Sequence, residues 1–192
     1  EFAYLASAAS AWVINTVTFE EYLAGIAEQS GDIPWEALRA SVVAYRTYGY
    51  AVRAIRRARA LAFDAAASTH NTPTFYTRHQ VYHGYAFERG SPRVAEAAAA
   101  TRGMVMTYGG EPIQSVYFSR AHGRTRSWHE EWGGPPKPWA MGVPDPYSVG
   151  RTLLGHGIGM PLQSCIAMGR AGANAELILR SYYSDVLFEF VY

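Results

Sequence analysis

Cysteine, net charge and long apolar runs are what this sequence has little of. Cys165 is the single cysteine among 192 residues, so the chain cannot form an internal disulfide. Seventeen basic residues offset sixteen acidic ones, and a net charge of +1 argues against nucleic acid as a partner. The sequence also lacks the run of about 18 apolar residues that a membrane-spanning helix requires.

Apolar and aromatic residues are plentiful instead. The chain is 49% hydrophobic and 17% charged, which is enough apolar material to build a core. Its length predicts a single domain over residues 1–192, with room for a small lobe around residues 64–90, where glycine, proline and histidine interrupt any periodicity. Fourteen tyrosines and five tryptophans are typical of proteins that stack sugar rings, although ordinary cores use aromatic residues too.

Helix and strand patterns alternate along the chain without an internal repeat. Thr18 and Glu21 form a capping box, and Gly109-Gly110 marks a hairpin turn. No helix is expected in the proline- and glycine-rich residues 120–150. The mixture predicts an α+β fold in which helices pack with short antiparallel strands and hairpins around a substrate groove. The predicted helices are 18–28, 34–60, 91–101, 162–170 and 175–183, and the predicted strands are 11–17, 104–108, 112–119 and 188–192.

Glu28 stands at the junction of the first two predicted helices. On a helical wheel it lies opposite the apolar stripe that runs from Phe19 to Ile26. Gly25, on the same face as Glu28, would let another backbone or a ligand approach closely. Periodicity alone favours a solvated acidic face, whereas a carboxyl group beside a cleft can also act as an acid on a glycosidic bond.

Four separated segments match one pattern in order. The first, residues 15–48, contains Glu-Tyr-Leu-Ala-Gly-Ile-Ala-Glu ending at Glu28, and the second is His-Gln-Val-Tyr at 79–82. The third runs from Thr-Arg-Gly at 101–103 to Trp-Gly at 132–133, and the fourth, residues 155–163, begins Gly-His-Gly-Ile-Gly-Met. Over nearly its whole length the chain resembles the SpoIID/LytB family of bacterial peptidoglycan proteins.

The resemblance implies an activity and a location. The stage II sporulation members of the family are lytic transglycosylases that cleave glycan strands between N-acetylmuramic acid (MurNAc) and N-acetylglucosamine (GlcNAc), leaving 1,6-anhydro-MurNAc ends. The matching position makes Glu28 the general acid/base, without a cofactor. The location implied is extracytoplasmic, in the bacterial cell envelope, with any signal or anchor outside this sequence. The partners implied are peptidoglycan glycan strands and an N-acetylmuramoyl-L-alanine amidase.

The matched segments also suggest which residues accompany Glu28. Aromatic side chains from Tyr45, Tyr48, Trp35 or the proline-rich loop are expected beside it. Gln29-Ser30 stand where the family usually has Met-Pro. No cysteine accompanies His70 and His79, so no metal site is expected. The candidate substrate-binding residues are Arg46, Tyr48, Ser119, Arg124, Thr125, His156 and Gln163.

Two other interpretations compete with the enzyme. The LytB-like members of the family are described as amidase enhancers, which bind peptidoglycan without cleaving it. A small binding domain of unrelated function, in which the motifs are structural, is the third interpretation. Glycan digestion separates the first two interpretations, and an absence of glycan binding would leave the third.

Overall fold

The computed structural model describes residues 2–5, 10–13, 15–59, 64 and 80–192. His70 and His79 lie outside the described residues, as does most of the lobe expected around residues 64–90. None of the described helices is long and apolar enough to cross a membrane.

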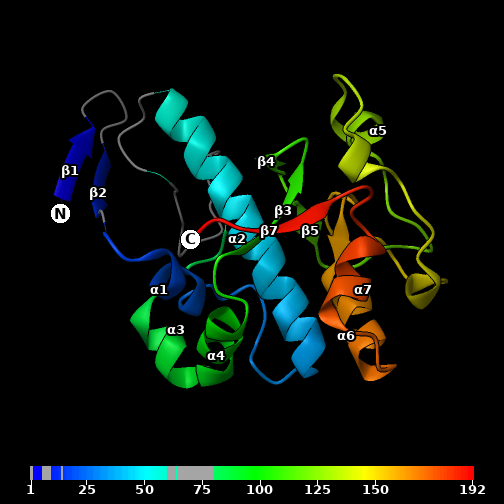
Figure 1. Cartoon of the computed structure of the whole chain (residues 1–192), viewed down its shortest axis with the longest axis horizontal. Coiled ribbons are helices and arrows are strands. Elements are labelled where there is room, and N and C mark those ends of the chain that lie inside the picture. The colour runs from blue at the N-terminus through cyan, green and yellow to red at the C-terminus, as the bar shows by residue number, and fades with distance from the viewer. Residues whose placement is uncertain (1, 6–9, 14, 60–63, 65–79) are drawn as a thin grey trace.

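A long central helix, α2 (Trp35–Ala58), organises the molecule (Figure 1). It begins after Pro34, whose ring restricts φ to a value suited to a helix start, and its buried face includes Leu38, Val42 and Tyr45. On one side of α2 lie α1 (Phe19–Ala24), α3 (Tyr85–Gly90) and α4 (Pro92–Ala100). On the other side lie α6 (Leu162–Arg170) and α7 (Ala175–Arg180). Cys165 of α6 is completely buried against α2, as an apolar residue would be.

The described residues also form three small sheets. In the first, β3 (Met104–Tyr108) lies between β4 (Glu111–Pro112) and β7 (Leu187–Phe190), antiparallel to both. In the second, β5 (Tyr117–Phe118) pairs in parallel with β6 (Met160–Pro161). The third is the antiparallel pair of β1 (Phe2–Leu5) and β2 (Ser10–Val13). The predicted α+β class is therefore confirmed.

Several predicted boundaries are wrong. The first helix ends at Ala24 rather than Glu28, the strand predicted at 11–17 is limited to β2, and the strand predicted at 112–119 is split into β4 and β5. Residues 120–150 do contain a helix, α5 (Trp128–Trp132), and 3₁₀ turns at Pro138–Ala140 and Pro146–Ser148. A second capping box, Ser127 with Glu130, stabilises α5.

Candidate active site

A segment that is distant in sequence, residues 81–84, packs against the C-terminal end of α1. Gly25 closes the helix, and its carbonyl oxygen accepts hydrogen bonds from the backbone N–H groups of His83 and Gly84. A Cβ at Gly25 would lie 2.6 Å from Cε2 of Tyr82 and 2.8 Å from Cα of Gly84. The missing side chain therefore permits the close backbone approach that the sequence suggested.

Glu28 follows this junction and is held from two sides. Its Oε1 accepts the backbone N–H of Val81 at 2.8 Å and the hydroxyl of Tyr117, on β5, at 3.1 Å. In residues 15–59, 64 and 80–192, the hydrogen bonds to this half-buried carboxyl group fall on Oε1 and no lysine or arginine pairs with it. Neutral donors thus fix one oxygen of Glu28, and Oε2 is left for another partner.

The four matched sequence segments meet at this place. Glu28 belongs to the first, Val81 to the second and Tyr117 to the third. The next residue along the chain, Gln29, donates from Nε2 to the carbonyl of Leu162 in the fourth segment. Two distant segments therefore donate hydrogen bonds to the Glu28 carboxyl group, and a third contacts the neighbouring Gln29.

A chain of hydrogen bonds supports Tyr117. The hydroxyl of Tyr22 donates to Oε1 of Gln80 at 2.7 Å, and Nε2 of Gln80 donates to the hydroxyl of Tyr117 at 3.1 Å. Gln80 is only 2% exposed, so its amide is held away from water. Sequence reasoning assigned no role at the site to Tyr22, Gln80 or Tyr117, although all three lie inside matched segments.

Tyrosines surround the Glu28 carboxyl group. Burial raises the pKa of Tyr22, Tyr45, Tyr48 and Tyr117, and the nearby charge of Glu28 raises the pKa of each further. These phenols therefore stay protonated at neutral pH and remain hydrogen-bond donors. Two of the aromatic residues expected near Glu28, Tyr45 and Tyr48, lie close enough for its charge to raise their pKa, and their rings lie 4.7 and 6.2 Å from the ring of Tyr117.

His156 is held beside β5, the strand that contains Tyr117. Its Nδ1 accepts the backbone N–H of Ile158 at 3.1 Å, so Nε2 carries the proton and donates to the carbonyl of Tyr117 at 3.0 Å. Burial lowers the pKa of His156, which keeps the ring neutral near pH 7. Its ring also lies 4.9 Å from that of Trp132 on α5.

Ser119 and Gln163 lie next to each other just after the C-terminal end of β5. The backbone N–H of Gln163, at the start of α6, donates to the carbonyl of Ser119 at 3.0 Å. The Gln163 side chain is exposed and lines a pocket beyond the strand. These two residues therefore lie just beyond the C-terminal ends of the β5–β6 pair that carries Tyr117.

Three other predicted residues are engaged elsewhere. Arg46 is completely buried and forms an ion pair with Glu20 at 2.9 Å, which contradicts its expected contact with substrate. Thr125 is also buried, and its hydroxyl accepts the N–H of Val143 at 2.9 Å, so it fixes a loop. Arg124 is exposed, but Glu130 occupies its guanidinium.

Glu21 is engaged in the helix cap. Its Oε2 accepts both the N–H and the hydroxyl of Thr18 at 2.7 Å, and these hydrogen bonds lower the pKa of Glu21. Within the part of the chain that the structure describes, no three His, Cys, Asp or Glu side chains gather as a metal site would require.

Comparison with known proteins identifies the family. A sequence model of the family described as "Stage II sporulation protein", SpoIID, matches residues 7–108, more than half of the chain. The chain belongs to the SpoIID family. The matched region includes Glu28, Gln80 and all of α2, whereas Tyr117 and His156 lie beyond it.

Two curated relatives are similar to this SpoIID-family chain over part of its length. The Stage II sporulation protein D of Bacillus subtilis is 27% identical over 130 residues, which is 62% of this chain and 36% of that protein. An uncharacterized protein of Brachyspira hyodysenteriae is 35% identical over 123 residues, which is 63% of this chain and 30% of that protein. The aligned region spans about a third of the length of either relative.

Proposed function

We propose that this SpoIID-family chain is a peptidoglycan lytic transglycosylase with Glu28 as its single general acid/base. The observation that carries the proposal is the setting of Glu28. Its carboxyl group is half-buried, lies among tyrosines, and accepts hydrogen bonds from neutral donors on one oxygen only within the described residues. Such a group is placed to act as a general acid/base, because no lysine or arginine of the described residues pairs with it.

A single acid/base suffices for this reaction. Glu28, protonated on Oε2, donates that proton to the glycosidic oxygen between MurNAc and GlcNAc as the bond to C1 breaks. The resulting carboxylate accepts the proton of the C6 hydroxyl of the same MurNAc as its oxygen attacks C1. The products are a 1,6-anhydro-MurNAc end and a free GlcNAc hydroxyl, and Glu28 is protonated again. Intramolecular attack gains from proximity and requires no second carboxylate to activate water.

The two donors to Oε1 assist the first half of the reaction. Hydrogen bonds to an ionised carboxylate are roughly twice as strong as those to a neutral acceptor. The N–H of Val81 and the hydroxyl of Tyr117 therefore stabilise Glu28 as it becomes negative. Tyr117 stays a donor throughout, because burial and the charge of Glu28 raise its pKa well above neutral.

The setting of the reaction is proposed from the family. The B. subtilis relative is named for the second stage of sporulation, so we assign the chain to wall remodelling of that kind, outside the cytoplasmic membrane. Glycan strands are the proposed substrate. An N-acetylmuramoyl-L-alanine amidase, which strips stem peptides from the strand, is the proposed partner.

Digestion of purified glycan strands tests the proposal. The wild-type chain is expected to release 1,6-anhydro-MurNAc ends, detected by mass spectrometry, and Glu28→Gln is expected to lower the rate by about 10²- to 10⁴-fold because the acid is lost. Glu96→Gln is the matched control, since Glu96 lies on α4 outside the Glu28 site, and it should retain full activity.

The same assay identifies the non-catalytic alternative. Glycan that is bound but left intact by the wild-type chain would refute the enzyme and favour an amidase enhancer. Equal activity of Glu28→Gln and wild type would refute the role of Glu28 alone.

A further inference from the structure

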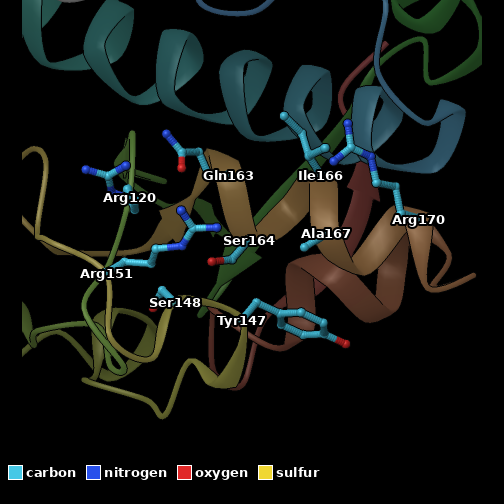
Figure 2. Close-up of a pocket in the computed structure, with 9 residues that line it drawn as sticks. All are labelled: Arg120, Tyr147, Ser148, Arg151, Gln163, Ser164, Ile166, Ala167 and Arg170. Carbon is cyan, nitrogen blue, oxygen red and sulfur yellow. The ribbon is translucent and has the colours of Figure 1, made fainter.

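A second feature lies at the far end of the β5–β6 pair. A pocket of about 320 Å³ opens between α6 and the loops at residues 120 and 147–151 (Figure 2). Figure 2 shows Arg151 reaching toward Ser164 of α6, with Arg120 and Gln163 beside it and Arg170 on the other side of Ile166. The lining residues are Arg120, Tyr147, Ser148, Arg151, Gln163, Ser164, Ile166, Ala167 and Arg170.

The arginines of this pocket are not neutralised. None of Arg120, Arg151 and Arg170 forms an ion pair within the described residues, whereas Arg46 and Arg124 each have a glutamate partner. Arg120 uses only Nε, which donates to the carbonyl of Thr152 at 2.8 Å. The outer nitrogens of its guanidinium therefore remain available for a ligand with two oxygens.

Asp145, an acid that contacts the pocket lining, is already committed to other hydrogen bonds. Asp145 is completely buried, and its carboxyl group accepts the hydroxyls of Ser164 at 2.7 Å and Tyr182 at 3.2 Å. The backbone carbonyl of Asp145 also accepts the hydroxyl of Ser148 at 3.2 Å. Asp145 thus holds two lining serines in place from beneath, and the three arginines still outnumber it.

The pocket is connected to the Glu28 site by short links. Tyr117, which contacts Glu28, lies three residues before Arg120, about 10 Å away along an extended chain. The next residue after Glu28, Gln29, is bonded to Leu162, directly before Gln163. One polymer can therefore reach both places.

We propose that this arginine pocket binds a carboxylate group of the cell-wall polymer while Glu28 acts on the glycan. The inference rests on the proposed function, because it assumes that glycan strands lie at Glu28. Arginine forks match the two oxygens of a carboxylate, and the pocket concentrates positive charge on a chain whose net charge is only +1.

Two parts of the polymer carry such a group. On a strand stripped of peptides, each MurNAc has a free lactyl carboxylate. On a peptide-bearing strand that carboxylate is consumed in an amide bond, and the free carboxylates belong to the stem peptide. The two sources therefore exclude each other at any one MurNAc, and separate substrates distinguish them.

Binding in a Glu28→Gln background tests the inference without turnover. The probes are stripped strands, peptide-bearing strands and GlcNAc oligomers, which have no carboxylate. Arg151→Gln is the main variant, since no side-chain hydrogen bond of Arg151 occurs within the described residues, and Arg120→Gln is the second. Each is expected to weaken binding of the carboxylate-bearing strand about tenfold, the usual scale for one charge-assisted hydrogen bond, and to leave GlcNAc oligomers unaffected.

The controls separate charge from structure. Arg89→Gln removes a charge from α3, far from the pocket in sequence, and should bind as the parent does. Arg151→Lys should restore part of the affinity, because it keeps the charge but loses the fork. Melting temperatures show that each variant is folded.

Each outcome decides something. A loss confined to stripped strands assigns the site to the lactyl group, and a loss confined to peptide-bearing strands assigns it to the stem peptide. Unchanged binding of both strands, or an equal loss with GlcNAc oligomers, overturns the inference. Failure of the wild-type chain to cleave any strand would overturn the proposed function while leaving this binding result to stand.

Discussion

The two ends of α1 carry carboxyl groups in opposite surroundings. At its start, Glu20 accepts a hydrogen bond from the completely buried guanidinium of Arg46 and another from the hydroxyl of Tyr192. Beyond its end, Glu28 meets only neutral donors in the described residues. The ion pair with Arg46 makes Glu20 part of the framework, whereas Oε2 of Glu28 has no hydrogen-bond partner among the described residues. A glutamate side chain is thus structural at Glu20 and open to a further partner at Glu28.

Removing the Glu20 charge should give the largest change in stability. Glu20→Gln leaves Arg46 buried without its counter-ion, and the expected loss is about 3 kcal/mol in the free energy of unfolding. Urea unfolding measures it. Glu176→Gln is the control, because its pair with Arg180 is exposed and contributes at most about 0.5 kcal/mol. A loss no larger than that of the control would contradict the comparison.

Substitution at Gly25 should disturb the Glu28 end in turn. The added Cβ of Gly25→Ala would collide with Tyr82 and with the backbone of Gly84, displacing the segment that includes Val81. We expect a loss of about 1–3 kcal/mol in stability together with reduced glycan cleavage. Gly90→Ala is the matched control, since among the described residues no atom beyond its chain neighbours and its own helix backbone lies within 4 Å of the place that its new methyl group would take. Full activity in Gly25→Ala would show that the close approach is dispensable.

Loss of one hydrogen-bond donor to Glu28 should lower the cleavage rate, with a smaller free-energy effect than the two substitutions above. Tyr117→Phe keeps the ring but removes the hydroxyl that bonds to Oε1, so the cleavage rate should fall about tenfold, or about 1.4 kcal/mol. Tyr50→Phe, a ring on α2 that packs on Phe19, serves for comparison. Steady-state rates on stripped strands measure the difference, and equal rates for the two variants would exclude a role for the hydroxyl.

The smallest effect concerns a second carboxyl group that is fixed by a cation. The Arg124 guanidinium lowers the pKa of Glu130 to about 2, with help from Ser127, from an ordinary value of 4.5. Because the unfolded chain takes up this proton at higher pH, the stabilisation is complete above pH 4.5 and is lost as the pH falls toward 2. Glu130→Gln should therefore show a shallower decline of stability over that range in urea unfolding. An identical decline would mean that the ion pair does not contribute.

Local features of the fold followed from the sequence. The Thr18–Glu21 capping box, the hairpin at Gly109-Gly110 and the start of α2 after Pro34 depend on neighbouring residues, and the structure contains all three. The α5 capping box of Ser127 and Glu130 is equally local and was overlooked, because the surrounding prolines and glycines outweighed it.

The arrangement around Glu28 was accessible only in part. The order of the matched segments predicted Glu28 as the candidate catalytic residue, and tyrosines beside it were expected. The parallel pairing of Tyr117 with Met160 joins distant parts of the chain, and no periodicity reports it. Arg46 was misassigned because its place on α2 does not show that Glu20 and the carbonyl of Ala98 enclose it.

The buried amide of Gln80 limits how protons can move between Glu28 and the protein interior. Tyr22, Gln80 and Tyr117 point their hydrogens in one direction, and the amide cannot exchange its oxygen and nitrogen ends without turning over in a packed interior. Unlike a chain of water molecules, these three side chains therefore do not relay protons between Glu28 and the protein interior. In the reaction proposed above, Glu28 therefore regains its proton from the sugar and not from the protein interior.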